Sequence, residues 1–507
     1  MTDPGTAPIR SDEASSGRGS SGVIVDCAVL VGLAATLRFA WLGHASLWID
    51  ELFSVCWSQL DWHFLLREGA RTETNPPTYY ILLHAWMEVF GTTETAVRVP
   101  SALASTATVL VVYAIGRMMK DRRVAMLAAL LLAVNPVAVA SAPEARAYAL
   151  SAFLDGVGLL SIVGYVRRFG TIGTWSWGWL GAFVFSMIAT ASVHYTSLLF
   201  VAACFGAMGW RLVTTRPFPV REALAWVAAG LLTALVLAKL LILAASLSES
   251  NNLVWIGPLT VWSVVSFFLE LIVQLPETDA FLTVSWLVCA AFALVVIGAR
   301  PRLRGDRQFG VLILIPVLYC ALFIIAGWLR PMLLARVATW LVIPLCLILA
   351  RAALSQSGRW RSYAACAVPL LTFLFSTGYY YRFHEKEDWR GAIRLIATQP
   401  NCAGPLLVSE FNALGLYYYK IPAHRQAYVF LPDPRRRNSV EFSLSERLMH
   451  LPELDPGAII EFIETHPGTA VIMRWEYREV IPLDLQTLLA HAPTKARLDG
   501  GLTVACF

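Results

Sequence analysis

Long apolar segments recur from residue 23 to residue 381 of this 507-residue chain, and they constrain its fold more than any other feature. A membrane-spanning helix needs about 20 largely apolar residues. Charged residues make up only 15% of the chain, whereas a soluble globular protein carries about 25%. The pattern predicts a polytopic α-helical membrane protein with about eleven transmembrane helices. The predicted spans are 23–42, 97–116, 124–141, 148–166, 175–192, 194–210, 223–245, 281–298, 309–328, 337–351 and 363–381.

Basic residues between these segments predict how the chain is oriented. Five joints are strongly basic, and two predicted spans separate each joint from the next. Positive charge concentrates in cytoplasmic loops, so one topology accounts for all five. It predicts a disordered cytoplasmic tail over 1–21, a transmembrane region over 22–382 and an external domain over 383–507. The first apolar segment lacks a cleavage site and is interpreted as a retained span. The basic joints contain Arg117, Arg167, Arg211, Arg300 and Arg351.

The apolar stretch Tyr79–Phe90 is too short to be a further span. Twelve helical residues reach about 18 Å, against roughly 30 Å of hydrocarbon. Counting it as a crossing would also invert every later basic joint. We therefore expect a juxtamembrane helix within a long first external loop, residues 43–96.

The composition changes sharply after residue 382, where a small external α/β domain of about 120 residues is predicted. Strand-like runs occupy 405–409, 470–473 and 502–506, and helix-like runs occupy 389–397 and 458–465. Two of the nine cysteines, Cys402 and Cys506, fall in this region. They could form a disulfide if the domain faces an oxidising compartment, although their separation in space is not fixed by the sequence.

Asp50 and Glu51 lie just beyond the first predicted span, at the start of the first external loop. Carboxylates beside hydrocarbon are costly to place and usually functional. A helix end capped by negative charge, worth under about 1 kcal/mol, is the alternative. Either side chain could act as a general base at the membrane surface.

Three other external segments carry groups that could work with this pair. Glu144, Arg146 and Tyr148 lie in one turn, where an Arg–carboxylate clamp bracing the turn is the alternative interpretation. His194-Tyr195 opens the sixth span and would otherwise be an interfacial anchor. Arg330 and Arg336 precede the tenth span on the external side and need an anionic partner, either phosphate, a lipid headgroup or one of the carboxylates. Glu144 and His194 are also acceptable ligands for a divalent cation.

Taken in order, these segments resemble the GT-C membrane glycosyltransferases, in particular the branch of protein O-mannosyltransferases and the lipid A aminoarabinose transferase. The resemblance covers roughly residues 23–395. This chain has Ala142-Pro143 where many relatives carry Ser-Gln, so the local turn can differ. The matching motifs are Trp48-Ile49-Asp50-Glu51, Asn75-Pro76-Pro77, Arg98-Val99-Pro100-Ser101, Pro143-Glu144-Ala145-Arg146-Ala147-Tyr148, His194-Tyr195, Arg336 and Asp388-Trp389-Arg390-Gly391.

The resemblance implies transfer of a sugar from a polyprenyl phosphate to a hydroxyl on the extracytoplasmic face of the plasma (inner) membrane. The acceptor would be a lipid, a glycan or a protein, and no nucleic acid is expected. Asp50 corresponds to the general base, with Glu51 and Glu144 as further acidic positions. Substrate is expected at Asn75, Arg146, Tyr148, His194, Tyr195, Arg330 and Arg336. Phosphate is a good leaving group, so charge neutralisation by Arg336 or a divalent cation matters more than a second acid.

Two other classes of function remain as alternatives. A transporter or lipid-linked-sugar flippase would place charges along a path, and Asp26, Arg38, Asp155 and Lys239 lie within or near predicted spans. Transporters often show internal repeats and helices broken at mid-membrane, and no repeat is visible here. A receptor or scaffold anchored by the bundle is the other alternative, but eleven spans exceed what anchorage needs.

Overall fold

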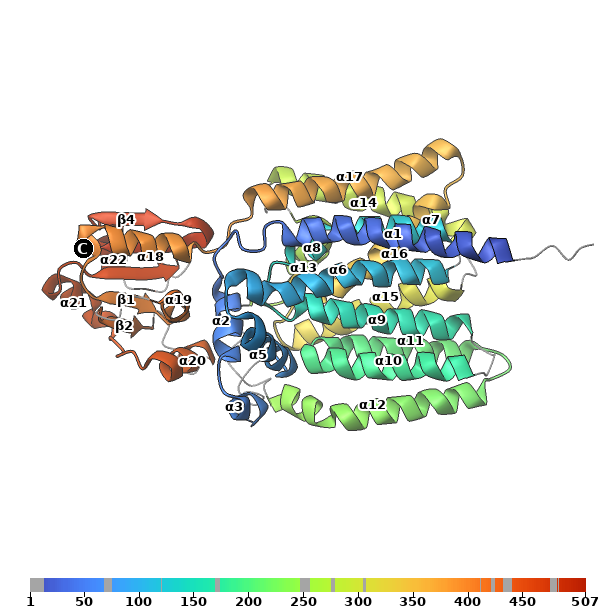
Figure 1. Ribbon diagram of the computed structural model, residues 1–507, viewed down its shortest axis with the longest axis horizontal. Helices are drawn as coiled ribbons and strands as arrows, with labels where there is room; N and C mark the ends of the chain where they lie inside the picture. Colours follow the sequence, from blue (N-terminus) through green and yellow to red (C-terminus); the bar gives the residue numbers. More distant parts are fainter. Residues whose placement is uncertain are drawn as a thin grey trace, which may run out of the picture.

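The computed structural model describes residues 13–67, 75–119, 121–168, 174–246, 256–274, 279–303, 307–410, 412–420, 425–431, 440–474, 481 and 483–507. Long helices form a bundle, and a small domain with a β-sheet sits at one end of it (Figure 1). The first helix, α1, begins at the opposite end of the bundle from the small domain. The chain is thus a multi-pass membrane protein, as the apolar pattern predicts.

Eight helical segments are long and apolar enough to cross a membrane, judged by length and composition within the described residues. Apolar residues on all sides make these helices suited to a bundle in lipid. The eight segments are Gly22–Phe39, Glu94–Met118, Tyr148–Arg167, Ser197–Thr214, Val220–Ile242, Phe281–Ala299, Gln308–Leu329 and Ala335–Leu354. The helices of the bundle are α1 (Glu13–Phe39), α6 (Glu94–Met118), α7 (Arg122–Ala133), α8 (Pro136–Ala140), α9 (Tyr148–Arg167), α10 (Thr174–Val193), α11 (Ser197–Thr214), α12 (Val220–Ser246), α13 (Val261–Ile272), α14 (Asp279–Leu303), α15 (Arg307–Leu329), η3 (Ala335–Leu341), α16 (Val342–Leu354) and α17 (Arg359–Phe383).

The expected count of eleven spans is not confirmed, and the segment 124–141 shows one reason. It is not a single helix: α7 ends at Ala133, and α8 begins at Pro136. The side chain of Asn135 accepts a hydrogen bond from the amide of Ala138 at 3.0 Å and so caps α8. An N-cap followed by proline at the first helical position is a strong helix start. The polar break therefore lies inside what reads as one apolar run.

Three helices lie between the bundle and the small domain (Figure 1). They are α2 (Ile49–Ser58), α3 (Trp62–Arg67) and α5 (Thr78–Phe90). The 13 residues of α5 span about 20 Å, and the helix packs against α2. This layer carries Asp50 and Glu51.

The small domain is built on a five-stranded sheet in the order β2-β1-β3-β5-β4. Strand β1 pairs in parallel with β2 and β3, whereas β5 pairs antiparallel with β3 and β4. The three strands expected from the sequence are present as β1, β3 and β5, while β2 and β4 were not predicted. The strands are β1 (Leu406–Ser409), β2 (Ala427–Phe430), β3 (Ala470–Arg474), β4 (Thr494–Arg497) and β5 (Leu502–Cys506), and the helices are α18 (Trp389–Thr398), η4 (Pro400–Cys402), α19 (Ala413–Tyr419), α20 (Val440–Met449), η6 (Pro456–Ala458), α21 (Ile459–Thr465), α22 (Leu483–Ala490) and η8 (Asp499–Gly501).

Alternate residues of the central strands pack on the two faces of this sheet, as the two-residue period of a strand requires. Leu406 and Val408 join a core that also contains Leu52 of α2 and Tyr80 of α5. Leu407 instead packs with residues of α21 and α22 on the other face. One face of the small domain therefore shares a hydrophobic core with helices α2 and α5.

A disulfide joins Cys402 to Cys506, with 5.0 Å between their Cα atoms. It ties the turn after α18 to the last strand, across 104 residues of chain. The pairing that the sequence left open is thus present.

Candidate active site

Glu51 has no exposed side-chain surface and lies in a network of ion pairs. Arg98 donates to both carboxylate oxygens of Glu51, from Nε and from Nη2, each at 2.7 Å. Lys386 Nζ lies 3.0 Å from Oε2, and the amide of Ala145 donates to Oε1 at 2.9 Å. Burial alone would raise the pKa of Glu51, but the charges of Arg98 and Lys386 outweigh it and lower the pKa to about 2. Glu51 is therefore ionised and enclosed by protein.

The same network fixes the chain around the end of the first span. The remaining N–H groups of Arg98 donate to the carbonyls of Leu42, Ala45 and Ser46, at 2.8 to 2.9 Å. All five N–H donors of this guanidinium are thus used. Lys386, which follows α17, also donates to the carbonyl of Pro143 at 2.7 Å. The network connects α2, α6, the turn of Glu144 and the start of the small domain.

Asp50 points elsewhere, because successive residues of a helix project about 100° apart. Its carboxylate lies 3.3 Å from Nη1 of Arg336, and the two side chains are 26% and 33% exposed. Arg146 donates to the backbone carbonyl of Asp50 at 3.3 Å and to Ser54 Oγ at 3.1 Å. The guanidinium of Arg336 also lies 5.4 Å from the centre of the Trp48 ring. Asp50 thus has a partly exposed carboxylate paired with Arg336, and Arg146 contacts its backbone carbonyl.

Glu144 lies in the turn before α9 and is half-buried. Burial raises its pKa, and the nearby charges of Glu51 and Asp50 act in the same direction, whereas Lys386 and Arg336 oppose them. The predicted acidic positions are therefore close enough in space to influence one another.

His194 and Tyr148 contact each other where α10 ends and α9 begins, with 5.8 Å between ring centres. The Nδ1 atom of His194 lies 2.7 Å from Thr196 Oγ1, which donates to the carbonyl of Val337 at 3.2 Å. Burial, with Arg146 and Arg336, lowers the pKa of His194 to about 3. His194 is therefore neutral, and its corner touches the segment that carries Arg336.

The other predicted substrate residues lie at the edges of this region. Tyr195 is half-buried in the same corner as His194, and Arg330 is half-buried in the turn between α15 and η3. Asn75 is also half-buried and precedes α5, the helix that packs against α2. Their part in substrate binding stays a prediction.

The predicted divalent cation also stays a prediction. Across the described ranges, no three or more His, Cys, Asp or Glu side chains form a group that could hold a metal ion. Glu144 and His194 thus lack a third side-chain ligand of these types there, and we assign no step to a metal.

Lys386 is the site residue that the sequence does not reveal. It lies 335 positions from Glu51 along the chain, in a polar segment with many charges. Arg98 was noticed only as part of a motif. A lysine directly after the last span is the one available signal, and an interfacial anchor gives the same signal.

The fold of this chain resembles that of several solved structures. The chain aligns with ArnT from Cupriavidus metallidurans in the apo state at a TM-score of 0.59 and 11% identity, covering 96% of this chain and 98% of that one. The bundle with its α/β domain therefore has the GT-C fold, and the resemblance found in the sequence is confirmed at the level of the fold.

Further comparisons agree. ArnT bound to undecaprenyl phosphate matches with a TM-score of 0.57 and 12% identity, over 96% and 98% of the two chains. Another match is AglB, an oligosaccharyltransferase of Archaeoglobus fulgidus solved with an inhibitory peptide and a dolichol-phosphate. Its TM-score is 0.53 and its identity 13%, and the alignment covers 92% of this chain and 72% of AglB. Residues 74–243 match the family model of the dolichyl-phosphate-mannose-protein mannosyltransferases. A search of curated protein sequences finds no significant match.

Proposed function

We propose that this protein transfers a sugar from a polyprenyl-phosphate donor to a hydroxyl acceptor, with Asp50 as the general base. The observation that carries the proposal is the accessible Asp50–Arg336 pair beside Arg146. A base and cations that can hold phosphate are the groups that this reaction needs. The solved relatives add support, since one of them binds undecaprenyl phosphate and another dolichol-phosphate.

The Asp50–Arg336 ion pair explains how donor binding would prepare the base. Arginine binds phosphate through paired hydrogen bonds, so the donor phosphate competes with Asp50 for Arg336. Asp50 is then free to accept the proton of the acceptor hydroxyl as its oxygen attacks the anomeric carbon. The bond from that carbon to the phosphate oxygen breaks, and Arg336 stabilises the negative charge on the leaving phosphate. A single displacement of this kind inverts the configuration at the sugar.

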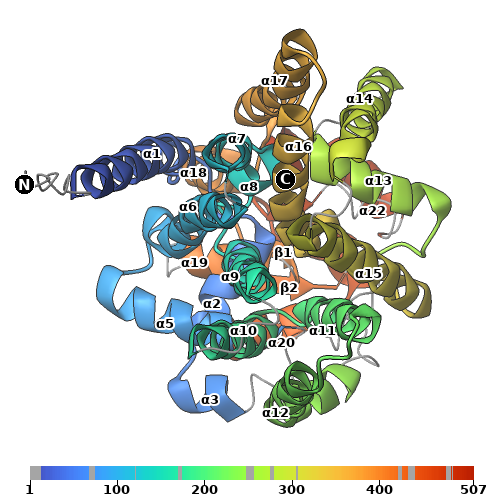
Figure 2. The ribbon, with the colours of Figure 1, turned by 90° about the vertical axis from the view of Figure 1, so that its right-hand side faces the viewer.

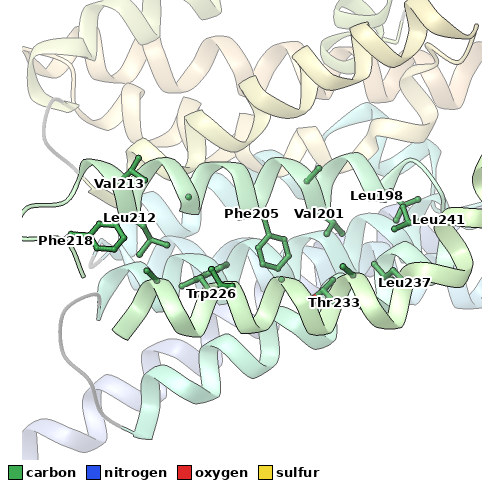
Figure 3. A pocket seen from close by; sticks show the side chains of 16 residues that line it. Leu198, Val201, Phe205, Leu212, Val213, Phe218, Trp226, Thr233, Leu237 and Leu241 are labelled. Atoms are coloured by element: carbon green, nitrogen blue, oxygen red, sulfur yellow. The ribbon is translucent and has the colours of Figure 1, made fainter. Parts of the chain in front are cut away.

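An apolar groove of about 600 Å³ between α11 and α12 provides room for the isoprenoid tail of the donor (Figure 3). Leu198 and Leu241 line one end of it, while Val213 and Phe218 line the other. Leu198 follows the corner that carries His194, so the groove begins beside the proposed site. Thr233 is its one hydroxyl-bearing residue among apolar neighbours, which suits a hydrocarbon chain.

The proposed orientation places the site outside the cytoplasm. The C-terminal ends of α6, α9, α11 and α16 carry Arg117, Arg167, Arg211 and Arg351. Positive charge at these ends favours a cytoplasmic location. The Cys402–Cys506 disulfide supports an oxidising compartment for the small domain.

The purified protein, incubated with polyprenyl-phosphate sugars and candidate acceptors, tests this function. Transfer should release polyprenyl phosphate and give a product of opposite anomeric configuration, as read by NMR of the glycosidic bond. Movement of the intact donor across a vesicle membrane, without cleavage, would contradict the proposal and favour a flippase.

A further inference from the structure

A buried polar cluster lies inside the bundle, below the proposed site. Its centre is Asp155 of α9, whose surface is only 1% exposed. Thr190 of α10 donates to Asp155 Oδ1 at 2.7 Å, and Ser151 donates to Oδ2 at 3.5 Å. Ser197 of α11 closes the cluster, 2.9 Å from Ser151 Oγ and 3.1 Å from Thr190 Oγ1. Helix α9 runs through the middle of the bundle, among α6, α10, α11 and α15 (Figure 2).

Helix α1 also contains buried ionisable side chains, Asp26 and Arg38, and each has polar partners that account for its burial. Asp26 is paired with Arg122 at 2.6 Å. Arg38 donates to Ser105 Oγ and to the carbonyls of Leu132 and Ala133 at the end of α7. Asp155 differs, because within the described part of the chain it forms no ion pair and is held only by hydroxyl groups. Ionisable residues inside a membrane bundle are rare and usually functional.

The cluster holds both sides of the corner between α10 and α11. The amide of His194 donates to the carbonyl of Thr190 at 3.0 Å, and the amide of Ser197 donates to the carbonyl of His194 at 3.1 Å. Residues 194–197 are thus anchored at each end by residues that contact Asp155 or its hydroxyl partner. Apolar side chains in these positions would pack but would leave the corner without a directional anchor.

The corner in turn contacts the segment that carries Arg336. Thr196 Oγ1 lies 2.7 Å from His194 Nδ1 and donates to the carbonyl of Val337 at 3.2 Å. Val337 is the neighbour of Arg336, whose guanidinium is 3.3 Å from Asp50. Hydrogen bonds that are linked covalently through Thr190, His194 and the Arg336–Val337 peptide therefore join Asp155 to the Asp50–Arg336 pair.

We infer that Asp155 is a positioning residue of the active site, which anchors the α10–α11 corner and through it places His194 and Arg336. This inference rests on the proposed function, since it assigns Asp155 a part in the same reaction. Because Asp155 has no cationic partner among the described residues, a neutral side chain of the same shape and hydrogen-bonding capacity should preserve its function. An apolar side chain of similar volume should not preserve it.

The test compares Asp155→Asn with Asp155→Leu in the full-length protein. Asp155→Asn should keep kcat within about 3-fold of wild type, whereas misplacement by an ångström should lower kcat about 10- to 100-fold in Asp155→Leu. The donor KM should rise in Asp155→Leu while the acceptor KM stays unchanged, because Arg336 is assigned to the donor phosphate. Asp26→Asn is the matched control, an intramembrane Asp in an ion pair away from the site, and should keep wild-type kcat.

Thr190→Val removes one hydroxyl without a large change in volume and covers the case in which Asp155→Leu does not fold. Like Asp155→Leu, it should lower kcat and raise the donor KM while leaving the acceptor KM unchanged. Wild-type kcat and KM in folded Asp155→Leu or Thr190→Val would overturn the inference. So would an inactive, folded Asp155→Asn.

A readout without turnover separates this inference from the proposed function. In protein labelled with ¹⁵N-histidine, the imidazole resonance of His194, identified by its loss in His194→Gln, should shift in Asp155→Leu and stay in place in Asp155→Asn. If wild type transfers no sugar but this pattern holds, the proposed function fails while the anchoring of the corner stands. An unchanged His194 resonance in Asp155→Leu would refute the anchoring itself.

Discussion

Replacing Glu51 with glutamine should destabilise the protein far more than the same change at Asp50. The side chains of Glu51 and Arg98 are 0% and 1% exposed, and that of Lys386 is 6% exposed. Glutamine would leave two buried cations without their shared counter-charge. Removal of one partner from a buried pair costs about 3–5 kcal/mol.

The pKa of Glu51 leads to a similar magnitude. This pKa is about 2 in the folded protein, against the ordinary value of 4.5. At roughly 1.4 kcal/mol for each pKa unit, the ionised form of Glu51 contributes about 3 kcal/mol to the stability of the fold. Because the folded pKa is the lower one, this stability is complete above pH 4.5 and is lost as the pH falls towards 2.

The assay is a denaturant titration of the purified, detergent-solubilised protein at neutral pH, with Asp50→Asn as the matched control. Glu51→Gln should lower the free energy of unfolding by about 3–5 kcal/mol, and Asp50→Asn, in a partly exposed pair, by less than about 1 kcal/mol. A Glu51→Gln protein within about 1 kcal/mol of wild type would refute the structural role that we derive for the network.

Three further changes probe the donor phosphate, the donor tail and the disulfide. Arg336→Gln should lower kcat about 10²- to 10³-fold by removing charge stabilisation, measured with saturating donor; an unchanged kcat would exclude Arg336 from that role. Ala202→Trp, in the α11–α12 groove, should raise KM for a long-chain donor more than for a short-chain one. Leu103→Trp, at a half-exposed position of α6 outside the groove, should change neither KM. Equal effects of Ala202→Trp on both donors would place the tail elsewhere. Cys402→Ser should destabilise the small domain by about 2–5 kcal/mol in a denaturant titration, with the free Cys366→Ser as control; a difference below about 0.5 kcal/mol would show that the disulfide is dispensable.

The fold could be predicted from the sequence where one pattern dominates. Apolar length indicated the bundle, and alternating or continuous apolar runs located β1, β3 and β5. Strand β4, with the sequence Thr494-Lys495-Ala496-Arg497, was missed because it contains two cations and no apolar run. Strand β2, with Ala427-Tyr428-Val429-Phe430, was missed although it is as short and as apolar as β1. The break at Asn135-Pro136 was missed for a different reason, since apolar residues continue on both sides of it.

The site shows a clearer limit of what sequence reasoning can achieve. Adjacent carboxylates are visible in the sequence, but which one faces the site depends on how α2 is docked. That docking is set by Arg98 and by Lys386, far away in the chain. Asp155 was visible only as an acid within a span, and its meaning depends on hydroxyl groups from two other helices. Contacts between residues so far apart in the chain can be identified only once the fold is known.

Turnover by Asp50→Asn tests the central claim most directly. The variant keeps the shape of the side chain but loses the base, so kcat for transfer from a polyprenyl-phosphate sugar should fall by at least about 10²-fold. Binding of polyprenyl phosphate should persist or tighten, because Arg336 loses its competing carboxylate. Near-normal turnover by folded Asp50→Asn protein would contradict the assignment of Asp50 as the base.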